Sequence, residues 1–194
     1  MVRSRRSTGA DRMNIRPYRN QLPRLGANVY IDPAAVVIGD VVLGDDASLW
    51  PGTVVRGDVH YIRVGARTNI QDGTIVHVTH DGEYSPGGFP TLIGADVTIG
   101  HAAVIHACTI EDAVLIGMHA TVLDGARVKK HGFVAAGAVV APGKVVGERE
   151  LWVGNPARCM RTLSDREVEQ LYYSAKHYVR LKDEYLAAQK PGSE

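Results

Sequence analysis

The chain has few aromatic residues and little net charge, and each shortage narrows the class of protein. Only 6% of its 194 residues are aromatic, and 22 lysines and arginines against 21 acidic residues give a formal net charge of +1. So small a net charge favours neither a nucleic-acid partner nor an acidic membrane surface. No apolar run approaches the roughly 18 residues of a membrane-spanning helix. We therefore expect no nucleic-acid partner and no membrane span.

Cysteine is scarce too, with only Cys108 and Cys159 in the chain. Two cysteines are too few for a disulfide framework, so a reducing, cytoplasmic location is the default expectation. The first dozen residues contain four arginines but no apolar run follows, so they do not resemble a secretory signal. We expect residues 1–14 to form a disordered leader, with a transit peptide as the alternative.

Glycine, in contrast, is frequent at 21 residues, as in a chain that makes many tight corners. An aliphatic residue recurs every six positions over most of the chain, with a few longer or shorter steps. A small residue commonly stands two positions before it, so both side chains face the same side of a strand. The repeating aliphatic residues are Ile38, Leu43, Leu49, Val55, Val64, Ile70, Val76, Ile93, Ile99, Ile105, Ile110, Ile116, Val122, Val128, Val134, Val140 and Val146.

This six-residue period is typical of a parallel β-helix, in which three short strands make one coil of about 18 residues. Coils stack at the inter-strand spacing of about 4.8 Å. The repeat leaves room for about six coils, so we expect a β-helix domain over residues 15–157. A β-sandwich is the alternative, but it would have strands of variable length and Greek-key turns, which the regular period disfavours.

The period changes near the C-terminus. Ser164 and Glu167 have the spacing of a capping box, and apolar residues then follow at intervals of three and four. The pattern predicts an amphipathic helix that ends before Pro191. We expect residues 158–190 to carry this helix, packed on a face of the β-helix, with docking on a neighbouring subunit as the alternative.

Three histidines stand out against the repeat. His77 and His106 each directly follow a repeating aliphatic residue, and they are 29 residues apart. That distance is one 18-residue coil plus the eleven residues from His80 to Pro90, which we expect to form a loop. The two imidazoles should therefore stack in one outward column and converge on a metal ion. His101 falls at a corner and points elsewhere, so a neighbouring subunit would have to supply it.

Four short motifs surround these histidines: RGD at 56–58, NIQDG at 69–73, IVH at 75–77 and GHAAVIH at 100–106. Together they resemble the gamma-class carbonic anhydrase family. The longer segment 56–80 is most similar to the bacterial YrdA-like branch of that family. The resemblance covers about residues 16–186.

The resemblance implies a left-handed β-helix that forms a homotrimer with metal sites between its subunits. His77 and His106 would come from one chain and His101 from the next. The metal would be Zn2+, with Fe2+ or Co2+ possible, because three imidazole nitrogens do not choose between them. The implied activity is hydration of CO2 to bicarbonate by a metal-bound hydroxide.

The resemblance also assigns roles to other residues. Gln71 would hydrogen-bond the metal-bound hydroxide, Arg56 and Asp58 would form an interface pair, and Asp72 would support the site. Two positions depart from the active members of the family. Val59 stands where they carry a glutamate, and His80 stands in place of their glutamate proton shuttle. His80 could carry protons instead, or could be an ordinary loop residue.

Two alternative functions therefore stay open. The same trimer could be a metal-binding or assembly protein with weak or no catalytic activity, as the missing glutamates would suggest. Less favoured is a hexapeptide acyltransferase, which would use a histidine as general base with acyl-coenzyme A. That chemistry has no need of three histidines.

Overall fold

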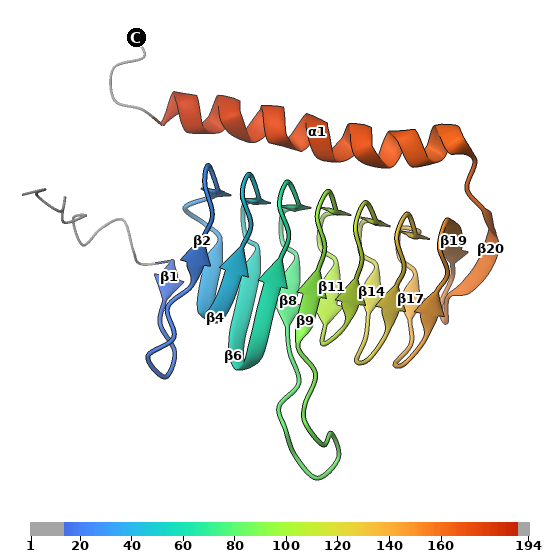
Figure 1. Ribbon diagram of the computed structural model, residues 1–194, viewed down its shortest axis with the longest axis horizontal. Coiled ribbons are helices and arrows are strands. Elements are labelled where there is room, and N and C mark those ends of the chain that lie inside the picture. Colours follow the sequence, from blue (N-terminus) through green and yellow to red (C-terminus); the bar gives the residue numbers. More distant parts are fainter. Residues whose placement is uncertain (1–13, 190–194) are drawn as a thin grey trace, which may run out of the picture.

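The computed structural model describes residues 14–189. The leader expected over residues 1–14 therefore lies outside the described residues apart from Asn14. The described chain winds into stacked parallel coils, and the helix α1 (Asp165–Ala188) runs along the whole stack (Figure 1). This confirms the predicted mainly β fold, a parallel β-helix with one C-terminal α-helix.

The coils present three faces, which we name by what they carry. The helix face holds parallel strands in the order β3 (Tyr30–Ile31), β5 (Ser48–Leu49), β7 (Asn69–Ile70), β10 (Thr98–Ile99), β13 (Leu115–Ile116), β16 (Phe133–Val134) and β19 (Glu150–Val153), with β20 (Arg158–Thr162) antiparallel to β19. The histidine face holds β1 (Ile15–Arg16), the first halves of β4 (Val36–Leu43) and β6 (Val54–Val64), then β8 (Ile75–His77), β11 (Val104–His106), β14 (Thr121–Val122) and β17 (Val139–Val140). The third face holds β2 (Arg24–Leu25), the second halves of β4 and β6, then β9 (Thr91–Ile93), β12 (Thr109–Ile110), β15 (Arg127–Val128) and β18 (Val145–Val146).

The repeating aliphatic residues fill the space between the three faces. Ile70, Ile99 and Ile105 are completely buried, and almost every other member of the repeat is buried with them. The first member is the exception, because Val37 pairs with Val55 and is buried while Ile38 faces outward. The predicted register was therefore wrong by one residue at its N-terminal end, where β4 continues around a corner instead of ending as a short strand.

Small residues occupy the inward position two residues before an aliphatic one, as the pattern predicted. Where this residue is threonine, its hydroxyl bonds to a carbonyl of the next coil: Thr74 donates to Gly100 O at 3.0 Å. Cys108 fills the same kind of position and is 2% exposed. Burial raises the pKa of its thiol to about 12, so Cys108 acts as a small core residue.

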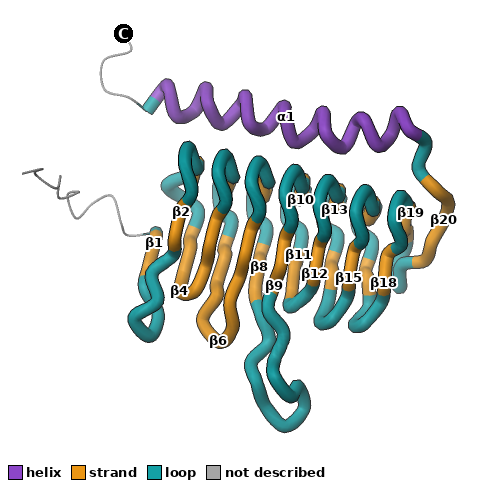
Figure 2. The backbone as a smooth tube through the Cα atoms, in the orientation of Figure 1, coloured by secondary structure: helices purple, strands orange, loops and turns teal. Residues whose placement is uncertain are grey.

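A loop interrupts the stack between β8 and β9. It projects away from the side that carries α1 (Figure 2). Thr79 and Phe89 close its base, because each backbone N–H donates to the other residue's carbonyl at 3.0 Å. The eleven residues from His80 to Pro90 thus leave the coil and return to it at neighbouring points, as the sequence predicted, so the six-residue register resumes at β9.

The helix α1 lies on the helix face and contacts β3, β5, β7 and β10. Its N-terminus has the predicted capping box, in which Ser164 Oγ accepts from Glu167 N and a Glu167 carboxylate oxygen accepts from Ser164 N at 2.9 Å. Further along, the buried Lys182 ammonium forms an ion pair with Asp46 at 2.9 Å. No helix within residues 14–189 is long and apolar enough to cross a membrane.

The capping box leads to a prediction about pH. Hydrogen bonds from Arg161 and from Ser164 lower the pKa of Glu167 from 4.5 to about 2. Because the folded pKa is depressed, the stabilisation is present above pH 4.5 and is lost as the pH falls towards 2. Arg161→Ala is expected to raise the Glu167 pKa towards 4.5 in a carbon-13 NMR titration of the carboxyl group. The matched control Arg166→Ala should leave it unchanged, and an unchanged pKa in Arg161→Ala would contradict this account of the cap.

Candidate metal centre

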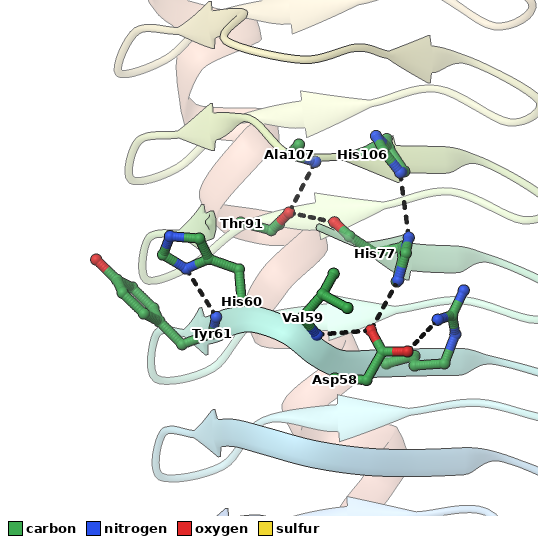
Figure 3. A network of polar contacts seen from close by, with 9 residues as sticks. Asp58, Val59, His60, Tyr61, His77, Thr91, His106 and Ala107 are labelled. Carbon is green, nitrogen blue, oxygen red and sulfur yellow. Dashed lines mark hydrogen bonds and ion pairs between the residues drawn. The ribbon is translucent and has the colours of Figure 1, made fainter. Parts of the chain in front are cut away.

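His77 and His106 meet on the histidine face, as the spacing predicted. Strands β8 and β11 pair in parallel with His77 directly opposite His106. The side chains both point outward from the coil, and His77 Nδ1 lies 3.1 Å from His106 Nε2 (Figure 3). The interruption of eleven residues between the two coils therefore does not disturb the histidine column.

The side chain of Thr91 holds the backbone segments that carry these two histidines. Its hydroxyl donates to His77 O at 2.5 Å and accepts from Ala107 N at 2.9 Å (Figure 3). Thr91 is completely buried, so neither bond competes with water. The two neighbouring coils are thereby joined at the positions where the histidines leave them.

Each of the two imidazoles has a carboxylate at its far nitrogen. Asp58 Oδ1 lies 3.0 Å from His77 Nε2, and Asp124 Oδ1 lies 2.7 Å from His106 Nδ1. An ionised carboxylate only accepts hydrogen bonds, so each one holds the ring proton on the nitrogen that faces it. His77 Nδ1 and His106 Nε2 are then left with lone pairs, and these are the two nitrogens that face each other.

Two lone pairs at 3.1 Å repel each other unless a cation or a shared proton lies between them. Two nitrogens bound at about 2.0–2.1 Å to one tetrahedral zinc ion lie roughly 3.3 Å apart. The donor atoms of this pair therefore fit two ligands of one divalent cation, with a carboxylate behind each ring.

Arg56 and Asp58 lie beside the pair and bond to each other within one chain. Burial would raise the pKa of Asp58, but the hydrogen bonds from His77 and Arg56 outweigh it and lower the pKa. Asp58 therefore stays ionised and can act on both neighbours at once. Arg56 follows Val55 as His77 follows Val76, and the pairing of Val55 with Val76 puts Arg56 in the histidine column on the neighbouring coil.

His101 lies at the corner after β10, away from the other two histidines. Its Nδ1 is 2.8 Å from Asp72 Oδ2, so His101 also has a carboxylate behind its ring. It lines a cavity of about 420 Å³ together with Gln71 and Tyr178. Gln71 is buried and donates to Asn69 Oδ1 at 3.0 Å. Within residues 14–189 of a single chain, no three histidine, cysteine or acidic side chains are arranged to hold a metal.

The proposed proton carrier His80 is exposed in the loop. Its ring lies over Gly82, where an added Cβ would be 3.1 Å from His80 Nε2. Among the described residues no hydrogen bond connects its side chain with His77 or His106. Val59, at the position where active family members carry a glutamate, is 40% exposed. One chain therefore places no acidic side chain at either of the two positions that the family uses.

The sequence reasoning missed Asp124 and Thr79. Asp124 follows His106 by 18 residues, and its carboxylate also accepts a hydrogen bond from the Thr79 hydroxyl. Ile105 pairs with Val122, 17 residues later, so Leu123 and not Asp124 takes the column position of His106. The repeat therefore gives no signal for Asp124, because only the turn of the chain at the corner brings it to His106.

The comparisons with known proteins agree with one another on the family. A model described as bacterial transferase hexapeptide (six repeats) matches residues 23–57. Protein YrdA of Escherichia coli is 51% identical over 172 residues, which cover 89% of this chain and 94% of that protein. A protein of Methanocaldococcus jannaschii named "Probable carbonic anhydrase" is 42% identical over 82% of this chain and 96% of its own length.

A plant relative and a solved structure extend the comparison. Gamma carbonic anhydrase 2, mitochondrial, of Arabidopsis thaliana is 50% identical over 82% of this chain, which spans 57% of the plant protein. The crystal structure of a hexapeptide transferase family protein from Anaplasma phagocytophilum superposes with a TM-score of 0.83 at 40% identity, covering 90% of this chain and 99% of that one. The chain belongs to the gamma carbonic anhydrase-like family of hexapeptide-repeat proteins, in its YrdA-like branch.

Proposed function

We propose that this protein is a metal-dependent catalyst that hydrates CO2 to bicarbonate at sites between the subunits of a homotrimer. His77 and His106 of one subunit and His101 of the next would hold the metal. The observation that carries the proposal is the facing pair of ring nitrogens, His77 Nδ1 and His106 Nε2, which lie 3.1 Å apart with a carboxylate behind each ring. The position of His101 on another side of the coil supports a shared site.

A bound divalent cation would supply a Lewis acid that makes a hydroxide nucleophile available near neutral pH. Asp58 and Asp124 would keep the two imidazoles neutral and oriented. Gln71 gives its amide N–H to Asn69, so its carbonyl oxygen is left to accept a hydrogen bond in the cavity beside His101. Met118 and Phe133 line the same cavity and would offer apolar surface to CO2.

The metal is expected to be zinc, with iron or cobalt as alternatives, because an all-imidazole donor set suits all three. Stripping the metal with a chelator should abolish hydration in a stopped-flow pH-indicator assay. Adding back Zn2+, Co2+ or Fe2+ should restore it in proportion to the metal bound. His119→Ala is the matched control, since it removes an exposed imidazole from the next corner along from His101 and should leave the rate unchanged. A fully metal-loaded protein with no rate above buffer would contradict the catalytic part of the proposal.

A second candidate is the same metal-binding trimer acting in binding or assembly without turnover. The observation that favours it is the exposed loop position of His80 together with Val59 at the glutamate position. Metal-loaded protein that lacks hydration activity would support this second candidate. The solved structure named as a hexapeptide transferase makes acyl transfer a third candidate, which binding of acetyl-coenzyme A to the metal-free protein would support.

A further inference from the structure

Asp124 connects His106 to the base of the loop between β8 and β9. One carboxylate oxygen lies 2.7 Å from His106 Nδ1, and the other accepts a hydrogen bond from the Thr79 hydroxyl. The Asp124 side chain is about one-third exposed, so a contact with water could replace either bond if the geometry were not fixed.

Thr79 is itself held in place. It is the last residue before the loop, and its backbone N–H and carbonyl both bond to Phe89 across the base of the loop. The Phe89 ring packs towards the corner that follows Asp124, since an added Cβ on Gly125 would lie 3.7 Å from Phe89 Cε1. The closed base of the loop and the corner that carries Asp124 therefore support each other.

We propose that Asp124 is a positioning residue for His106, and that Thr79 orients Asp124 for this task. The Asp124 carboxylate keeps the His106 proton on Nδ1 and directs Nε2 towards His77. The Thr79 hydroxyl occupies the second oxygen and prevents the carboxylate from rotating away. The loop thereby helps to set the affinity of the site for metal without contributing a ligand. This inference deepens the proposed function and rests on it.

The physical reason lies in what a neutral imidazole can do. It has two tautomers, and only the one protonated on Nδ1 presents a lone pair at Nε2. A charge-assisted bond to a carboxylate is roughly twice as strong as a neutral one, so Asp124 selects this tautomer firmly. Residues that stand behind a metal-bound imidazole in this way typically change metal affinity by about 10–100-fold when they are removed.

The test measures two independent quantities in each variant. One is zinc affinity by competition with a chromophoric chelator, and the other is the His106 tautomer by nitrogen-15 NMR of the metal-free protein. Asp124→Ala is expected to weaken zinc binding about 10–100-fold and to remove the preference for the Nδ1–H tautomer. Asp124→Asn should lose less, because its amide oxygen can still accept from Nδ1–H.

The threonine is tested by a conservative pair. Thr79→Val removes the hydroxyl at nearly constant volume and should weaken binding in the same direction as Asp124→Ala, by a smaller factor. Thr79→Ser keeps the hydroxyl and should restore the wild-type value. Asp96→Ala is the matched control, since Asp96 is a carboxylate that pairs with Arg67 at 2.7 Å and touches no histidine.

The outcomes separate this inference from the proposed function. Wild-type zinc affinity with an unchanged His106 tautomer in Asp124→Ala would overturn the inference while leaving the metal site intact. A wild-type protein that binds no zinc would defeat the proposed function, and the NMR tautomer would still decide the role of Asp124. If Asp124→Ala does not fold, the test uses Asp124→Asn and the two Thr79 variants. A Thr79→Val protein with the wild-type zinc affinity and the wild-type His106 tautomer would refute the role of Thr79.

Discussion

The substitution His106→Ala is expected to remove both bound metal and CO2 hydration. It deletes one of the two converging nitrogens and leaves His77 Nδ1 as the sole ligand on that column. Removing a metal ligand should weaken zinc binding more than removing a residue that only hydrogen-bonds a ligand. We therefore expect zinc affinity to fall by more than about 100-fold. Metal analysis of the purified variant and stopped-flow CO2 hydration measure the two effects on the same sample.

The fold should survive this substitution. The His106 side chain is about one-third exposed and lies outside the coil, while the neighbouring Ile105 fills the core. Metal-free wild type and metal-free His106→Ala should therefore unfold at similar temperatures. Retention of stoichiometric zinc by the variant would contradict the assignment of His106 as a ligand. Loss of zinc with normal hydration would refute the link between metal and activity.

The second large effect is expected from mixing two inactive variants. His101→Ala and His106→Ala should each bind no metal, because every site of the proposed homotrimer would lack one imidazole. In trimers assembled from an equal mixture, a subunit with intact His106 can adjoin a neighbour with intact His101. Random assembly of a ring of three gives this arrangement in about one quarter of the sites. In the unfractionated mixture, zinc content and hydration rate should both return to about one quarter of wild type.

Co-expression of the two variants with different affinity tags, followed by sequential purification, would isolate the mixed trimers. Each mixed trimer has one complete site of its three, so recovery in this purified sample should rise to about one third of wild type. Two differently tagged copies of His106→Ala provide the control and should recover nothing. No recovery in trimers shown to be mixed would mean that the ligands act within one chain. Full activity in either variant alone would exclude that histidine from the site.

Much of this arrangement could be predicted from the sequence because a β-helix converts sequence spacing directly into position in space. Each coil repeats the last, so His77 and His106 had to lie in one column once the loop was set aside. The same regularity puts Cys108, two residues before Ile110, in the buried core. The capping box at Ser164 was predictable for a different reason, since its two residues are only three positions apart in the sequence.

The features that could not be predicted lie at the corners of the coil, where the six-residue repeat does not determine the path of the chain or the direction of a side chain. Val37 replaced Ile38 in the core because β4 continues around a corner. Asp124 reaches His106 from the residue after the column position, and Thr79 reaches Asp124 only because the base of the loop closes on Phe89. Whether His101 of a neighbouring subunit completes the site depends on how chains assemble, and no repeat within one chain specifies that geometry.

The most direct test of the central claim is the crystal structure of the protein crystallised with zinc, with data collected at the zinc absorption edge. The account predicts anomalous peaks between subunits, each about 2.0–2.1 Å from nitrogens of His77 and His106 of one chain and of His101 of the next. Zinc bound entirely within one chain, or a trimer whose zinc lies away from these histidines, would contradict it.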